Sequence, residues 1–135
     1  MLKSFVATAP KGRVLLVDSI TKVSPEDKGA HVVSASHGGA SSGEFALETP
    51  LASVFFNDAG VGKNKAGILA LDMLQARGVA AGAISHETGC IGDSMDMWEN
   101  GVISHANALA VAAGLKPGLR VKDALLHAIG ASERQ

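Results

Sequence analysis

Short apolar runs alternate with polar, glycine-rich segments along most of the chain. Four of these runs predict strands, at residues 13–20, 31–35, 51–56 and 79–84. Between the last two, apolar residues recur every three or four positions from Ala66 to Leu74, which predicts a helix that ends at Arg77-Gly78. A strand, a helix and a strand in direct succession form a right-handed βαβ unit with parallel strands. The pattern therefore predicts an α/β fold with a mainly parallel sheet.

The remaining segments predict short helices. Ser24 is placed to cap a turn that begins at Pro25, and residues 41–48 predict one or two helical turns that end before Pro50. The C-terminal third predicts three helices: one capped by Asp93, one capped by Ser104 that ends at Gly114, and one over residues 121–129. With no repeat or linker in the sequence, we expect residues 1–135 to form one small α/β domain with two or three layers and C-terminal helices.

Three predicted strands each stop at a loop of glycines and ionisable side chains. These loops follow residue 35, residue 56 and residue 84. If the strands are parallel neighbours, their carboxyl ends meet at one edge of the sheet, where open α/β folds place their ligands. The sequence therefore predicts the location of a site but does not name a reaction.

The first loop is Ser36-His37-Gly38-Gly39. Paired glycines let backbone amides approach an anion, so Ser36, Gly38 and Gly39 are expected to bind a ligand and His37 to join the catalytic groups. The alternative is a tight turn with an exposed His37.

The second loop contains Asn57, Asp58, Gly60, Gly62 and Lys63 ahead of a predicted helix. All five are candidate site residues, with Asp58 as a general base or metal ligand and the others as ligand-binding groups. The alternative is that Asp58 only binds amides within its own turn. The loop is not a Walker A motif, which needs glycine at position 57 and serine or threonine at position 64; both carry asparagine, so ATP hydrolysis is not predicted.

The third loop carries His86, Glu87, Cys90 and Asp93 within eight positions. His86 and Glu87 are expected to act as acid or base, and Cys90, Asp93 and the later His105 to bind the ligand. A thiolate nucleophile at Cys90 competes with the interpretation of an inert, small hydrophobic residue. Asp93 also suits the cap of the following helix.

A metal site is the other chemistry to consider. His37, Asp58, His86 and Asp93 offer nitrogen and oxygen ligands from adjacent strand ends. No local pair, such as two histidines four residues apart on a helix, supports this arrangement. We therefore assign no metal, and the sequence leaves the cofactor unknown.

Composition narrows the class of partner. The 12 basic and 13 acidic residues give a net charge of -1, without the basic field that nucleic acid or an anionic membrane requires. One cysteine excludes an internal disulfide, and no apolar run approaches the length of a membrane span, so we expect a cytoplasmic protein. Aromatic residues make up only 4% of the chain, so burial of Phe55, Phe56 or Trp98 between subunits of a homo-oligomer is a further expectation.

Several motifs resemble known sequences. The 57–63 loop, Ile91-Gly92-Asp93, residues 101–104 and Asn107 are similar to a bacterial family of hypothetical proteins, and this resemblance covers residues 31–118. Residues 74–82, 114–118 and 123–125 are more distantly similar to the YunC-like family of unassigned function. The resemblance implies a small, oligomeric α/β domain and supplies no activity. In the family pattern the position of Cys90 can carry arginine, which implies a pocket that meets an anion rather than a cysteine nucleophile.

Two classes of function fit these residues. The first is an enzyme that acts on a carboxylate- or amide-containing metabolite, with Asp58 and His86 as acid and base, Glu87 assisting and Lys63 steering an anionic group. The second is a non-catalytic, regulatory oligomer that uses the same loops to bind a small anion. A purely structural or partner-binding role is the remaining hypothesis.

Overall fold

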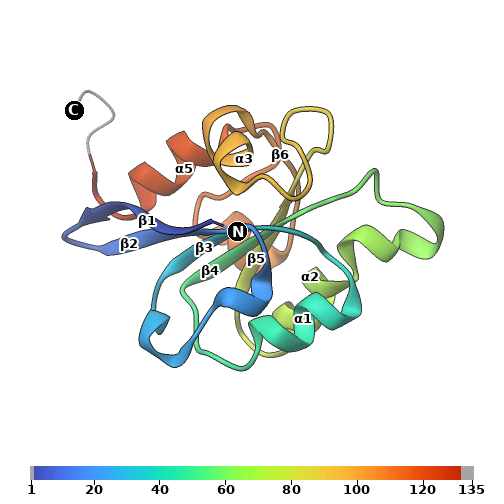
Figure 1. Cartoon of the computed structure of the whole chain (residues 1–135), viewed down its shortest axis with the longest axis horizontal. Helices are drawn as coiled ribbons and strands as arrows, with labels where there is room; N and C mark the ends of the chain where they lie inside the picture. The colour runs from blue at the N-terminus through green and yellow to red at the C-terminus, as the bar shows by residue number, and fades with distance from the viewer. Residues whose placement is uncertain (1, 132–135) are drawn as a thin grey trace.

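A computed structural model describes residues 2–131, which fold around one six-stranded sheet (Figure 1). The strands lie in the sheet in the order in which they occur along the chain. Their bounds are Lys3–Ala9 (β1), Gly12–Val17 (β2), His31–His37 (β3), Ser53–Asn57 (β4), Ala80–Ile84 (β5) and Ile103–Ala106 (β6).

The four central strands are parallel, and the two outer strands run the other way. β2, β3, β4 and β5 pair in parallel, whereas β1 and β6 each pair antiparallel with their neighbour. The predicted parallel neighbours are therefore confirmed, and the loops after β3, β4 and β5 share one edge. Because β6 is reversed, its first residues lie beside the carboxyl end of β5, where Ile84 pairs with Ile103.

Helices and short 3-10 helices connect the strands. The α-helices are Ala40–Ala46 (α1), Leu69–Ala76 (α2), Ser94–Asn100 (α3), Ala108–Ala112 (α4) and Val121–Ala128 (α5), and the 3-10 helices are Ile20–Lys22 (η1), Pro25–Asp27 (η2) and Lys63–Ile68 (η3). Ser24 and Asp27 form a capping box around η2, and Asp93 caps α3, as the sequence predicts. α2 ends at Ala76 with Arg77 as its C-cap, and Gly78 follows with a φ of 78°.

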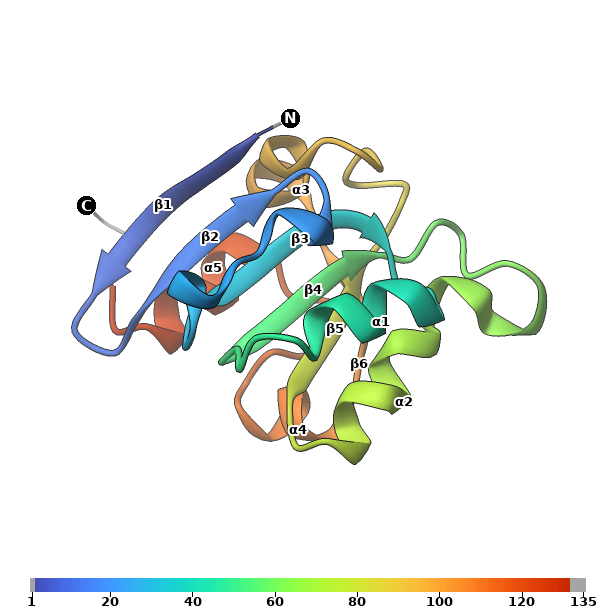
Figure 2. The same ribbon diagram turned by 60° about the horizontal axis from the view of Figure 1, so that its bottom comes forward.

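Successive side chains of each strand point to opposite faces of the sheet, so the core has two layers. In β4, Phe55 packs with α3 and α5 on one face, and Phe56 packs with α1 and α2 on the other. Figures 1 and 2 show these two pairs of helices on opposite sides of the sheet. The fold is therefore a three-layer α/β arrangement, which decides between the two architectures left open by the sequence.

The two outer parts of the sheet differ from the prediction. Ser104 does not cap a helix but lies in β6, and Asn107 caps α4 instead, accepting from the amide of Ala110. β6 is a strand because it pairs with β5 on one side and contacts the 118–120 segment on the other, where Ile103 N–H donates to the Leu119 carbonyl at 2.9 Å. Val102, just before β6, bridges to Arg120. At the other end, β1 was not expected, and the strand predicted to run to residue 20 ends at Val17.

The large aromatic side chains are already covered within one chain. Phe55 and Phe56 are fully buried and Trp98 is 4% exposed. The expectation that these three residues supply an oligomer interface is therefore wrong, because they form this chain's own core. Within residues 2–131, no helix has the length and apolar content that crossing a bilayer requires.

Two carboxylates away from the loops tie the N-terminal strand to the domain. Asp18 accepts hydrogen bonds from the amide of Leu2 at 2.8 Å and from the hydroxyl of Ser94 at 2.7 Å. Asp27 is buried and pairs with the ammonium of Lys3 at 2.9 Å. Burial acts to raise the pKa of each carboxyl. It is outweighed at Asp18 by the hydrogen bonds from Leu2 and Ser94, and at Asp27 by those from Ser24 and Lys3, so both pKa values fall below the usual 3.8.

These shifts predict a loss of stability in acid. A carboxyl whose pKa is lower in the folded state adds stability that is complete above the unfolded-state pKa and disappears as pH falls through the folded-state pKa. In urea unfolding, the contribution of these two carboxyls to the free energy of unfolding should therefore be level near neutral pH and decline below about pH 4. Asp27→Asn should flatten this decline. A free energy of unfolding with the same acid dependence in the variant and in the natural chain would contradict the role of Asp27.

Candidate functional site

A buried carboxylate, Asp58, lies directly after β4 at the edge that the three loops share. It is 4% exposed. Its Oδ1 accepts from the amides of Gly60 at 2.8 Å and His86 at 3.1 Å, and its Oδ2 accepts from the hydroxyl of Ser104 at 2.7 Å. The residue therefore joins the loop after β4, the loop after β5 and strand β6.

These contacts keep Asp58 ionised. Burial acts to raise the pKa of its carboxyl, but hydrogen bonds from Ser104, Gly60 and His86 outweigh burial, and the pKa lies below its ordinary value. Near neutral pH the group is a negative charge held at a fixed position, which can only accept hydrogen bonds.

His86 is the imidazole that contacts this carboxylate directly. Its Nδ1 lies 3.2 Å from Oδ1 of Asp58, and half of its side chain is exposed. Because an ionised carboxylate only accepts, Nδ1 carries the proton, and Nε2 of the neutral ring keeps its lone pair. Asp58 thus fixes the tautomer and the orientation of a half-exposed base.

His105 approaches the other oxygen of the same carboxylate. Its Nδ1 lies 3.0 Å from Oγ of Ser104 and 4.0 Å from Oδ2 of Asp58. Since the Ser104 hydroxyl donates to Asp58, its oxygen accepts from Nδ1–H of His105, and Nε2 of this ring is also unprotonated when neutral. Ser104 is a positioning residue rather than a nucleophile, because its proton faces a carboxylate instead of an imidazole.

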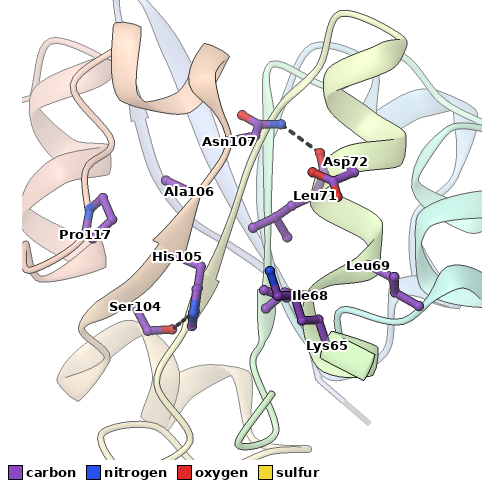
Figure 3. Close-up of a pocket in the computed structure, with 10 residues that line it drawn as sticks. All are labelled: Lys65, Ile68, Leu69, Leu71, Asp72, Ser104, His105, Ala106, Asn107 and Pro117. Atoms are coloured by element: carbon purple, nitrogen blue, oxygen red, sulfur yellow. Dashed lines mark hydrogen bonds between the residues drawn. The ribbon is translucent and has the colours of Figure 1, made fainter. Parts of the chain in front are cut away.

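A pocket of about 380 Å³ opens beside His105 (Figure 3). It lies between the η3–α2 segment and β6. Its lining combines an apolar wall with polar groups, and consists of Lys65, Ile68, Leu69, Leu71, Asp72, Ser104, His105, Ala106, Asn107 and Pro117.

A second hollow, of about 350 Å³, lies on the His86 side. His86, Glu87 and Cys90 share its lining, so the structure brings these three candidates together. The Cys90 thiol is exposed and lies 3.5 Å from the carbonyl of Ile91, and its amide donates to Asp96. Its described hydrogen bonds thus go to Ile91 and Asp96 rather than to His86.

The glycine amides of the first two loops are already hydrogen-bonded. Gly38 N–H donates to the carbonyls of Asn57 and Gly67, and Gly39 N–H donates to Nδ1 of His37. Gly60 N–H donates to Asp58, and Gly62 N–H donates to the carbonyl of Gly60 at 2.8 Å. These four amides therefore donate to groups within the protein. They do not form the open anion-binding site that the glycines suggest in the sequence.

Ser36 and His37, expected in a loop, are the last residues of β3, because β3 continues its pairing with β4 as far as His37 and Asn57. The ring of His37 is exposed and accepts from Gly39, and Ser36 accepts from the amide of Ile20. His37 and Ser36 line a separate hollow with Ser41 and Ser42. The structure thus joins Asp58 to His86 and His105, whereas His37 lines a different hollow and accepts from Gly39.

Of three other candidates, Asn57 and Asp93 form hydrogen bonds within the protein and Lys63 is exposed to solvent. Asn57 is fully buried and links two loops, because its amide nitrogen donates to the carbonyl of Gly89 and its oxygen accepts from Ala59 N–H. Asp93 accepts from Asp96 N–H at 3.0 Å as the cap of α3. Lys63 is exposed at the start of η3.

Sequence reasoning missed two features of the site. The first is Ser104, which the sequence predicts as a helix cap and which instead donates to Asp58 and accepts from His105. The available signal is a serine and a histidine side by side in an otherwise apolar segment, which is unusual for a strand without a polar partner. Lys65 and Asp72, which line the pocket, are not among the residues that the sequence predicts for the site. For metals, no group of three or more His, Cys, Asp or Glu side chains within residues 2–131 is arranged to hold an ion.

The fold and the site define a three-layer α/β protein with two imidazoles anchored on one buried carboxylate. No known family, curated protein or solved structure matches the chain. The resemblance to bacterial families thus remains a prediction, and function has to be argued from the site.

Proposed function

We propose that this protein is an enzyme that moves protons to and from a small metabolite containing a carboxylate or amide group. The observation that carries the proposal is the ionised, buried Asp58, which holds His86 directly and His105 through Ser104. Buried charges of this kind are costly unless they are fully hydrogen-bonded, and they are concentrated at functional sites.

The chemistry follows from the protonation states. A neutral His86 accepts a proton from the ligand at Nε2, and the fixed charge of Asp58 then stabilises the imidazolium that forms. His105, whose ring reaches the pocket, orients the ligand or returns a proton. Glu87 assists from the His86 side, and exposed Lys63 attracts an anionic ligand to the loops.

One observation favours an enzyme over a non-catalytic anion-binding module. Such a module would use free amides in its glycine loops, and those of Gly38, Gly39, Gly60 and Gly62 are already donated within the protein. The groups that remain accessible at the loops are titratable side chains such as His86 and Glu87. Such groups suit proton transfer better than the binding of an anion.

The test begins with thermal unfolding of the purified chain against a panel of metabolite acids and amides. A ligand at about 100 times its dissociation constant should add roughly 2.7 kcal/mol to the stability, which raises the midpoint by about 9 °C. Compounds that stabilise the chain are then assayed for turnover. His86→Gln should lower kcat about 10²- to 10⁴-fold and keep most of the ligand-induced shift, because only proton transfer is lost.

The matched control is His127→Gln, an exposed histidine on α5 that does not contact Asp58 or line either hollow. It should keep full turnover. Unchanged kcat in His86→Gln would remove His86 from the mechanism. If no compound in the panel stabilises a well-folded chain, the proposal of a small-molecule enzyme loses its support.

A further inference from the structure

The pocket beside His105 carries two opposite charges that the Asp58 cluster does not use. Lys65 comes from η3 and Asp72 from α2, and both side chains are exposed at the pocket. Figure 3 shows Lys65 at the end of the pocket where Ser104 and His105 lie, and Asp72 at the other end, near Asn107. A ligand lying along this pocket would meet a cation at one end and an anion at the other.

The wall between the two charges is apolar. Ile68, Leu71 and Ala106 line it, and Leu69 is 41% exposed at the same pocket. A large exposed apolar side chain at a concave site is a surface that an apolar ligand segment covers favourably. The pocket thus matches a molecule with a hydrocarbon middle and charged ends.

The two charges stand well apart at the pocket. Lys65 and Asp72 are seven residues apart in the chain, and they lie at opposite ends of the pocket in Figure 3. Because both side chains are exposed and can change rotamer, an unbranched chain of several methylene groups suits the apolar wall between them.

We infer that the pocket binds an aliphatic amino acid whose ammonium and carboxylate groups stand at opposite ends of the chain. The carboxylate pairs with Lys65 beside His105, the methylenes lie on Ile68 and Leu71, and the ammonium pairs with Asp72. This inference rests on the proposed function, since it names the substrate class of the same cluster. It places the carboxylate end of the ligand at the imidazole of His105.

The inference is tested by titrating the full chain with three probes of equal length and following backbone amide shifts by NMR. The probes are 6-aminohexanoate, hexanoate and hexylamine. We expect 6-aminohexanoate to bind most tightly and to shift resonances of η3, α2 and β6. Loss of either charged end should weaken binding several-fold, in keeping with exposed ion pairs that each contribute modestly.

Charge-removing variants separate the two ends. Lys65→Gln should weaken 6-aminohexanoate and hexanoate about fivefold and leave hexylamine unchanged, whereas Asp72→Asn should weaken 6-aminohexanoate and hexylamine and leave hexanoate unchanged. Both positions are exposed, so the fold is expected to survive. Lys28→Met and Glu44→Gln, exposed charges that do not line the pocket, are the matched controls and should bind all probes as the natural chain does.

The inference is overturned if 6-aminohexanoate causes no shift in η3, α2 or β6, or if both pocket variants bind it as tightly as the natural chain. This failure is distinct from failure of the proposed function. A His86→Gln variant that loses turnover on some other ligand would keep the acid-base proposal while removing this substrate class. Conversely, charge-dependent binding of 6-aminohexanoate with unaltered turnover in His86→Gln would keep the pocket and remove the role of His86.

Discussion

Replacing Asp58 by asparagine is expected to lower turnover about 10²- to 10⁴-fold while the chain remains folded. An amide can donate as well as accept, so His86 would no longer be required to keep its proton on Nδ1. The imidazolium formed during proton transfer would also lose its counter-charge. Two measurements check this: kcat on the ligand found by the stabilisation screen, and the nitrogen chemical shifts of His86, which report the tautomer.

Asp18→Asn is the matched control for this experiment. Asp18 is also a carboxylate at a strand end that accepts several hydrogen bonds, yet its partners are Leu2 and Ser94 rather than a histidine. It should lower the free energy of unfolding without changing the turnover of the folded fraction. If both variants lose turnover in proportion to their lost stability, Asp58 has a structural role and no catalytic one.

Replacing Gly67 by alanine is expected to destabilise the domain by about 3 kcal/mol or more, and to lower its unfolding midpoint by about 10 °C. A Cβ at this position would lie 2.0 Å from the carbonyl oxygen of Asp58 and 3.1 Å from Cα of Val61. These are backbone atoms, so no side-chain rotation relieves the overlap, and the segment that holds the carboxylate must move. Thermal unfolding measures the loss, and the His86 nitrogen shifts show whether the Asp58 contact survives.

Gly29→Ala serves as the comparison. A Cβ there would meet no atom within 4 Å, but the φ of 82° is unfavourable for alanine, so a cost of about 1–2 kcal/mol is expected from the backbone alone. If Gly67→Ala is no less stable than Gly29→Ala, the backbone at residue 67 can move away from Asp58 without a measurable loss of stability.

The central part of the fold could be predicted because its signals are local. The apolar runs before His37, Asp58 and Ser85 are long enough to define β3, β4 and β5, and the helical spacing up to Leu74 defines α2. The outer strands could not be predicted in the same way. β6 is four residues long, and it is a strand because of what it pairs with, which a single sequence does not contain.

The sequence predicts that the candidate groups gather at the strand ends, and the structure brings only some of them into contact. The contact between Asp58 and His86 can be anticipated because both residues follow strands that the pattern predicts. His37 and His105 could not be ranked, because the register that turns one ring toward Gly39 and the other toward Ser104 depends on tertiary pairing. The strand order adds a further reason, since it runs from β1 to β6 without reversal and so lacks the crevice that a reversal creates.

The closed hydrogen bonding of the glycine loops also bears on the kinetics of ligand capture. The turns around Gly38 and Gly60 hold their shape through contacts within the protein, so a ligand does not have to order them on arrival. Little conformational entropy is then lost in the encounter, and no slow rearrangement precedes it. Association should consequently follow a single exponential whose rate rises linearly with ligand concentration, and differences in affinity among ligands should lie in how long each one stays.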